Sequence, residues 1–220
     1  MTDDNIKIEL LSDSRLSAND NLINFKIIIV GESGVGKSSI LKRAVQNKFD
    51  ESYQATIGFE FLLMHFKVND LRIKLQIWDT CGQEMYRSLI QGFYRNTTAT
   101  ILVFSKTNRS SFDNLGMWIK DIKNNTEQDM PILLAGNKND EEKDKIEVNK
   151  EEAEEISKQY NLRYFCECSA KTGYNINNIF EEIAKVVYKD YYLKRNPRKQ
   201  MAKMGLEKRE ENIGSKKRCC

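Results

Sequence analysis

Residues 31–38 read Gly-Glu-Ser-Gly-Val-Gly-Lys-Ser and decide the fold. They match the pattern G-x-x-x-x-G-K-[ST], follow the apolar run 25–30 (FKIIIV) and precede a helical pattern at 38–46. A buried strand, a glycine-rich loop and a helix in this order predict backbone N–H groups that converge on phosphate oxygens, with the positive end of the helix behind them. The sequence therefore indicates a site for a nucleoside triphosphate.

Several residues of this loop have separable roles. Gly34 and Gly36 let the backbone curl, Lys37 supplies a point charge to the outer phosphates, and the Ser38 hydroxyl can bind Mg²⁺. A glycine-rich turn with a chance Lys-Ser pair is the alternative, which the flanking strand and helix disfavour. The nucleotide contacts expected from this segment are Ser33, Gly34, Val35, Gly36, Lys37, Ser38 and Ser39.

Strand-like runs alternate with helical patterns on both sides of the loop. Such alternation favours a mostly parallel sheet with helices on both faces, so we expect a three-layer α/β phosphate-loop NTPase fold. The strand-like runs are 25–30, 59–68, 71–78, 99–104, 132–136 and 164–168, and the helical patterns are 38–46, 112–122, 151–160 and 176–187.

The segment 78–84 (WDTCGQE) lies at the end of a predicted strand, where ligands bind in open α/β sheets. Asp79 can hold Mg²⁺, the Gly82 N–H can contact a terminal phosphate, and Gln83 can orient an attacking water. Upstream, the hydroxyl of Thr56 can close over the metal. An ordinary turn after a strand would be the preferred interpretation of segment 78–84 if the phosphate loop were absent.

Two later strand ends carry the segments 136–140 (GNKND) and 169–171 (SAK). The Asp140 carboxylate can accept hydrogen bonds from the ring N–H and the exocyclic amine of guanine, a pair of donors that adenine lacks on that edge. The Ala170 N–H can donate to the guanine carbonyl. The other expected base contacts are Asn137, which braces the loop, Lys138 and Phe49, which cover the two ring faces, and Ser169 and Lys171.

These segments, in this order, resemble the Ras superfamily of small GTPases over about residues 25–190, and the Rab family more specifically. The Rab-like stretches are 57–61 (IGFEF), 74–80 (KLQIWDT), 86–89 (YRSL) and 93–95 (FYR). The resemblance implies a six-stranded sheet with one antiparallel edge strand, and five helices. It also implies two nucleotide-sensing segments, near 50–61 and 82–95, that the terminal phosphate holds in place and hydrolysis releases.

The resemblance implies a switch that cycles between GTP and GDP with Mg²⁺ and regulates vesicle trafficking by recruiting effectors to membranes. Gln83, Lys37 and Gly82 would serve hydrolysis, and no arginine finger is evident, so hydrolysis should be slow without an activating protein. The implied partners are effectors, an exchange factor, a GTPase-activating protein, a GDP-dissociation inhibitor and a prenylation escort; no nucleic acid is expected. Effectors would read an aromatic patch formed by Phe61, Trp78 and Phe93.

Three residues depart from the family pattern. Cys81 replaces the usual Ala before Gly82, Met85 stands where Rabs usually carry Arg, and Ser105 stands where an Asp is common. Cys81 is only slightly larger than Ala, so we expect modest consequences there.

Charge divides the chain unevenly. Ten Lys and Arg and three Glu in residues 194–220 give this segment +7, against +3 for the whole chain, so the remainder is −4. The chain ends in Cys219-Cys220, which resembles the Rab double-cysteine ending and implies two geranylgeranyl groups, with the basic residues adding attraction to anionic lipid. A solvated tail with unmodified thiols is the alternative.

We therefore expect a flexible extension at 1–24, a GTPase domain at 25–192 and a hypervariable basic tail at 193–220. No apolar run reaches the length of a membrane span, and the N-terminal stretch lacks the features of a secretory signal. The expected location is the cytoplasmic face of intracellular membranes, with a cytosolic pool.

Two other functions fit the phosphate loop. One is a P-loop kinase or ATPase, which segments 137–140 and 169–171 argue against. The other is a pseudo-GTPase scaffold that binds nucleotide without hydrolysing it, which the presence of Lys37, Asp79 and Gln83 disfavours.

Overall fold

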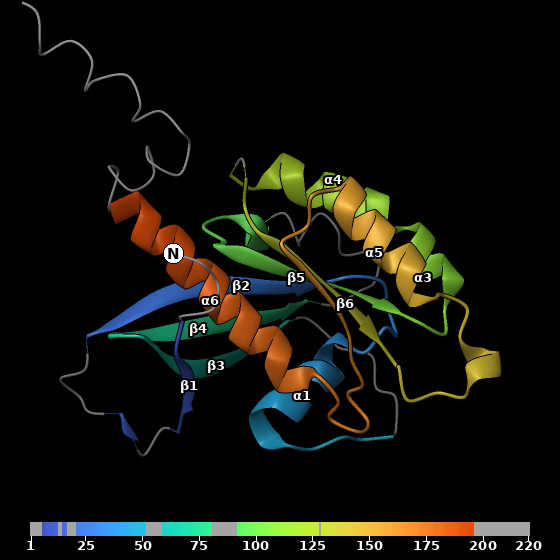
Figure 1. Ribbon diagram of the computed structural model, residues 1–220, viewed down its shortest axis with the longest axis horizontal. Helices are drawn as coiled ribbons and strands as arrows, with labels where there is room; N and C mark the ends of the chain where they lie inside the picture. The colour runs from blue at the N-terminus through green and yellow to red at the C-terminus, as the bar shows by residue number, and fades with distance from the viewer. Residues whose placement is uncertain are drawn as a thin grey trace, which may run out of the picture.

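The computed structural model describes residues 6–12, 15–16, 21–51, 59–80, 92–127 and 129–195. In this part of the chain the strands form one sheet in the order β1-β3-β4-β2-β5-β6-β7 (Figure 1). The strands are β1 (Ile8–Leu11), β2 (Leu22–Val30), β3 (Phe59–Val68), β4 (Leu71–Thr80), β5 (Ala99–Ser105), β6 (Ile132–Asn137) and β7 (Tyr164–Glu167).

Helices cover both faces of the sheet, as the alternation of patterns predicted (Figure 1). They are α1 (Lys37–Gln46), α3 (Arg109–Asp113), α4 (Leu115–Asn125), α5 (Lys150–Gln159) and α6 (Ile176–Arg195), with a 3₁₀ turn η4 (Lys143–Lys145). One core cluster joins α1 and α6 to the sheet, and a second joins α3, α4 and α5 to its other face. The three-layer α/β fold is confirmed.

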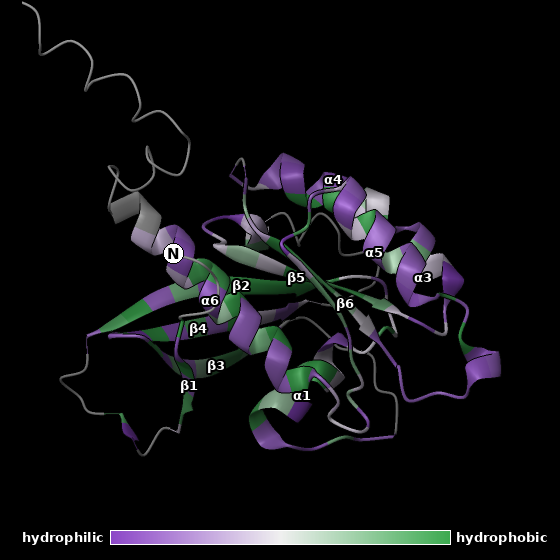
Figure 2. Cartoon of the chain, viewed as in Figure 1, coloured by the Kyte–Doolittle hydropathy of each residue, from purple (hydrophilic) through white to green (hydrophobic). Residues whose placement is uncertain are grey.

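The alternation of side chains along β2 shows why two cores form. Ile27 and Ile29 are fully buried in the first cluster, and Ile28 and Val30 in the second. Where a central strand is buried on both faces its successive residues must be apolar, which explains the uninterrupted apolar run at 27–30. Figure 2 shows hydrophobic residues along the central strands, and hydrophobic and hydrophilic residues alternating along the helices.

Parallel pairing places the functional loops at one edge of the sheet. β2 pairs in parallel with β4 and β5, and β5, β6 and β7 continue in parallel. The C-terminal ends of these strands therefore meet at the same edge, so the phosphate loop, Asp79 and the segments that follow β6 and β7 are neighbours.

The expectation of a flexible extension at 1–24 is wrong for part of that stretch. Ile8–Leu11 form β1, which pairs antiparallel with β3, and β2 begins at Leu22 rather than at residue 25. The described sheet consequently has seven strands instead of six, and its antiparallel edge strand is β1. A four-residue strand has almost no periodicity of its own and is defined by its partner, which lies over 50 residues away.

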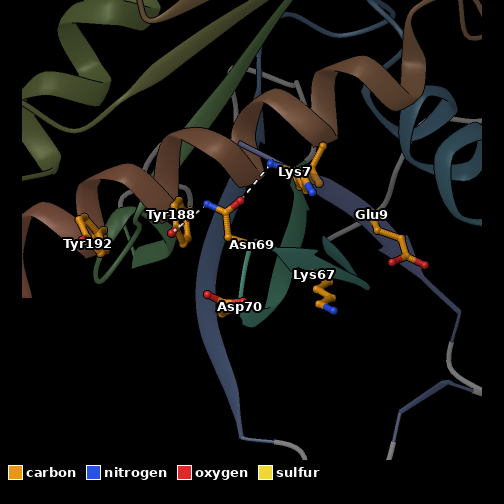
Figure 3. A pocket seen from close by; sticks show the side chains of 8 residues that line it. Lys7, Glu9, Lys67, Asn69, Asp70, Tyr188 and Tyr192 are labelled. Atoms are coloured by element: carbon orange, nitrogen blue, oxygen red, sulfur yellow. Dashed lines mark hydrogen bonds between the residues drawn. The ribbon is translucent and has the colours of Figure 1, made fainter. Parts of the chain in front are cut away.

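The β3–β4 turn connects this added strand to the last helix. The backbone N–H of Lys7 donates to Asn69 Oδ1 at 3.0 Å, and Asn69 Nδ2 donates to the Tyr188 hydroxyl at 3.1 Å. These contacts border a pocket that Lys67, Asp70 and other residues of this region line (Figure 3). The turn joins the N-terminal end of β4, so the pocket lies at the opposite end of this strand from Asp79.

Cys166 and Cys168, in the last strand-like run of the sequence (164–168), are buried small side chains. Their exposed fractions are 8% and 0%, and both thiols are free. Burial raises the pKa of Cys166 to about 12 and the pKa of Cys168 well above its ordinary value, so both thiols stay protonated and unreactive at neutral pH.

Candidate functional site

The phosphate loop connects the end of β2 to the start of α1, where the sequence placed it. Gly34 and Gly36 have φ of 76° and 96°, in the left-handed region that favours glycine. Lys37 is buried, and its ammonium donates to the carbonyl oxygens of Gly31 at 2.9 Å and Glu32 at 2.8 Å. The loop therefore curls around the side chain of Lys37, which is also the first residue of α1. The positive end of this helix thus lies at the loop.

Sequence reasoning missed the residue that fixes this loop to the second helical layer. Glu32 Oε1 accepts hydrogen bonds from Asn114 Nδ2 at 3.2 Å and from Trp118 Nε1 at 3.1 Å. Asn114 and Trp118 lie one helical turn apart, so both donors reach the same carboxylate. The sequence shows that Asn114 and Trp118 are four residues apart. It does not show that they contact Glu32, because that contact joins residues more than 80 positions apart.

Asp79, near the end of β4, is the carboxylate expected to hold the metal. It is completely buried, and its Oδ2 accepts a hydrogen bond from the Ser38 hydroxyl. Its Oδ1 has no hydrogen-bond partner among the described residues. Burial raises the pKa of Asp79 to about 6, although the Ser38 hydrogen bond and the Lys37 charge both act to lower it.

A buried carboxylate oxygen without a partner is costly, and a cation would remove that cost. The hydroxyl of Ser38 and the carboxylate of Asp79 are oxygen donors, which Mg²⁺ prefers. The residues present therefore fit a magnesium ion at this point. Thr56, the third expected ligand, lies outside the described residues.

We expect Asp79→Asn to stabilise the metal-free chain while weakening its affinity for Mg²⁺. At pH 7 the wild-type chain holds an ionised carboxylate whose folded pKa is about 6 against an ordinary 3.8, so removing the charge should raise the free energy of unfolding by about 1–3 kcal/mol. Urea unfolding in EDTA measures this.

Because folding raises the pKa of Asp79, the metal-free wild type loses stability as pH rises through roughly 4 to 6. The advantage of Asp79→Asn should therefore disappear below pH about 4, where the carboxyl group is protonated in both states. A variant that is less stable than wild type in EDTA at pH 7 would contradict the prediction.

Asn137, the last residue of β6, connects the phosphate loop to both base-reading segments. Its Nδ2 donates to the Val35 carbonyl at 2.8 Å, and its Oδ1 accepts from the Ala170 N–H at 3.1 Å. The side chain is almost completely buried. The sequence predicted that Asn137 braces the loop; its side chain joins two loops, the phosphate loop and the 169–171 segment, to the end of β6.

Asp140 and the 169–171 segment also meet. The Ser169 hydroxyl donates to Asp140 Oδ1 at 2.5 Å and itself accepts from the Thr172 N–H at 3.0 Å. Lys138, between Asn137 and Asp140, has φ of 67°. These bonds hold the Asp140 carboxylate in one orientation at the end of the sheet.

Arg43 of α1 is a second residue that the sequence did not single out. Its Nε donates to the Ala170 carbonyl at 2.8 Å, and one terminal nitrogen donates to the Lys171 carbonyl at 2.6 Å. The helix that follows the phosphate loop thus also supports the 169–171 segment. No local pattern marks such an arginine, because its acceptors are backbone carbonyls over 120 residues away.

Three aromatic residues expected to meet effectors lie together. The ring centroids of Phe61 and Trp78 are 5.1 Å apart, and those of Trp78 and Phe93 are 5.7 Å apart. Phe61 is 42% exposed, whereas Trp78 and Phe93 also pack partly against the second core cluster. The patch therefore consists of one exposed ring and two half-buried rings in contact.

Some of the remaining predicted residues lie in the described part of the chain, and the others lie outside it. Phe49 is half-buried and packs against the first core cluster, and the Ser105 hydroxyl shares a hydrogen bond with Thr107 at 3.0 Å. Ser33 and Lys171 are exposed, and Ser39 is half-buried in α1. The predicted residues that lie outside the described ranges are Thr56, Cys81, Gly82, Gln83, Met85, Cys219 and Cys220.

A strand, a curled glycine loop around a buried lysine, and a serine–aspartate pair beside it define a phosphate-loop nucleotide-binding protein with a magnesium site. Residues 26–189 match the family model described as "Ras family". The chain belongs to the Ras family. It is a small GTPase, a molecular switch that hydrolyses GTP, and the alternatives of a P-loop kinase or ATPase and of a pseudo-GTPase scaffold are set aside.

Membership in this family implies binding of GTP and GDP with Mg²⁺, and regulation by exchange factors and GTPase-activating proteins. Proteins of the family are often attached to membranes through lipid. Within the described ranges, no helix combines the length and the apolar character that crossing a bilayer requires.

Proposed function

We propose that the site described above binds guanine nucleotide through three groups of residues. Phosphates would lie against Ser33, Gly34, Val35, Gly36, Lys37, Ser38 and Ser39. The base would lie among Asn137, Lys138, Asp140, Ser169, Ala170 and Lys171, with Phe49 beside it. The contacts of Asn137 with Val35 and Ala170 support this assignment, because they make the phosphate and base sites one unit.

Bound Mg²⁺ would neutralise charge that develops on the phosphates, and Ser38, Asp79 and Thr56 would hold it. The Lys37 ammonium would turn from the carbonyl oxygens of the loop toward the outer phosphates. Its positive charge would stabilise the negative charge on the phosphate oxygens. Gln83 would orient the attacking water, and the Gly82 N–H would donate to the terminal phosphate. A positive charge from a GTPase-activating protein would stabilise the transition state further and so accelerate hydrolysis.

We infer further that the chain is a Rab-type GTPase that regulates vesicle trafficking by recruiting effectors. The observation that carries this is the contiguous aromatic patch of Phe61 near the start of β3, Trp78 near the end of β4, and Phe93. β3 and β4 connect the two segments expected to respond to the nucleotide, so a protein docked on these rings would sense both. An exposed aromatic surface is a common basis of protein recognition.

The tail completes the proposal. Cys219 and Cys220 would carry two geranylgeranyl groups, and the basic residues of 194–220 would attract anionic lipid. The protein would then act on the cytoplasmic face of intracellular membranes and keep a cytosolic pool bound to a GDP-dissociation inhibitor, after delivery by a prenylation escort.

We expect replacement of both Cys219 and Cys220 by Ser to move the protein from membranes to the soluble fraction. Two lipid chains anchor a protein stably, whereas the basic residues alone give weak, salt-sensitive attraction. Fractionation of cells that express the tagged full chain measures the change, and fluorescent GDP binding by the purified variant should equal wild type.

Ser215→Ala, in the same tail, is the matched control and should stay with the membranes. If the double cysteine variant still sediments with membranes in high salt, lipid attachment at these residues is not the anchor.

A further inference from the structure

A buried lysine lies behind the two base-reading segments. Lys106 directly follows β5, and 8% of its side chain is exposed. Its ammonium forms an ion pair with Glu167, the last residue of β7, and donates to Asn139 Oδ1 at 2.7 Å. Charges this buried are tolerated only when they are paired and hydrogen-bonded, so the contact fixes the elements that provide them.

The partners of Lys106 belong to both base-reading segments. Asn139 directly precedes Asp140, and Glu167 lies two residues before Ser169. The same segments meet again where the Asn139 N–H donates to the Cys168 carbonyl at 3.0 Å. One ammonium group therefore holds the two segments together from behind.

The backbone of Lys106 is itself held firmly. Its N–H donates to the Asn137 carbonyl at 2.9 Å, and its carbonyl accepts from the N–H groups of Glu147 and Val148 at 2.9 Å and 3.2 Å. The backbone of Lys106 is consequently fixed relative to the end of β6 and to the chain before α5. A side chain so anchored can position a loop, since it cannot follow the loop's movement.

We propose that Lys106 is a positioning residue for guanine recognition. It holds Asn139, and through it the orientation of the Asp140 carboxylate toward the exocyclic amine of the base. The proposal rests on the assignment of Asp140 to the base under the proposed function. Lys106 does not itself touch the nucleotide; it acts through Asn139 and through the ion pair with Glu167.

The test compares GDP with inosine diphosphate, which lacks the exocyclic amine. Full-length protein is loaded with either nucleotide, and the rate of dissociation is measured for wild type and Lys106→Met, which keeps the apolar stem. Residues of one hydrogen-bond network couple strongly, so we expect GDP to leave Lys106→Met about tenfold faster, whereas the rate for inosine diphosphate, which keeps only the ring N–H contact to Asp140, rises clearly less. The ratio of the two rates should therefore shrink.

Two further variants separate positioning from stability. The double variant Lys106→Met with Glu167→Gln removes the uncompensated carboxylate that the single variant leaves, and it should show the same reduced ratio even if the single variant folds poorly. Lys185→Met is the matched control, because its pair with Glu182 lies on α6, and it should keep the wild-type ratio.

A wild-type rate ratio in both Lys106 variants, accompanied only by a lower melting temperature, would overturn the proposal. A different outcome is a wild-type protein that releases GDP and inosine diphosphate equally fast. That result would reject the assignment of Asp140, and the role of Lys106 with it, and it is recognised without any variant.

Discussion

Asp140→Asn is expected to lower the affinity of the chain for GDP by roughly a thousandfold or more, because a site built to pair hydrogen-bond donors rejects a mismatch strongly. The Asp140 carboxylate is held by the Ser169 hydroxyl at 2.5 Å. An amide in its place presents N–H groups toward the two donors of guanine, so both polar partners lose a hydrogen bond in a desolvated place.

The measurement is dissociation and equilibrium binding of fluorescent GDP. Binding of xanthosine diphosphate gives a more specific test. Xanthine carries a carbonyl where guanine carries its exocyclic amine, and the side-chain amide of the Asp140→Asn variant can donate to that carbonyl. Affinity for xanthosine diphosphate should therefore rise as affinity for GDP falls. Asp144→Asn, in the nearby turn η4, is the control and should bind GDP as wild type does. Unchanged GDP affinity in Asp140→Asn would remove the assignment of guanine selection to this residue.

Gly36→Ala should destabilise the folded chain and disrupt the nucleotide site. Gly36 has φ of 96°, and a Cβ there would lie 2.3 Å from Asn137 Nδ2. Relief of this clash requires Asn137 to move, which breaks its bonds to Val35 and Ala170. We expect a loss of about 2–4 kcal/mol in the free energy of unfolding and a large loss of GDP affinity, since strain, steric overlap and broken buried bonds act together.

Gly34→Ala isolates the steric part of this effect. Gly34 also has a positive φ, of 76°, but an added Cβ would meet nothing within 4 Å. Urea unfolding of both variants without nucleotide should show a clearly smaller loss for Gly34→Ala, near the cost of a strained backbone alone, about 1–2 kcal/mol. Equal losses in the two variants would mean that Asn137 yields easily and does not couple the loops.

The sequence was informative where structure is decided locally. The run before the phosphate loop, the glycines within it and the polar residues at strand ends are short patterns, and the positions of Lys37, Asn137 and Asp140 follow from them. Parallel strand order then brings these residues to one edge.

What the sequence could not show depends on distant partners. β1 exists through its pairing with β3, and the roles of Glu32, Arg43 and Lys106 arise from contacts across 33 to 128 residues. Such side chains look like ordinary surface charges until tertiary structure buries them or supplies their acceptors.

The contacts of Asn69 bear on where a fluorescent tag can be attached to the protein. Lys7 and Tyr188 meet on this one side chain, so the start of the described chain lies against the helix that leads toward the cysteines. A bulky tag joined a few residues before Lys7 would be attached beside this part of α6 and would crowd any partner that binds there. Imaging is therefore best done with a short epitope or with a long spacer, and mislocalisation of a directly fused barrel should be checked against such a small tag before it is assigned to the GTPase itself.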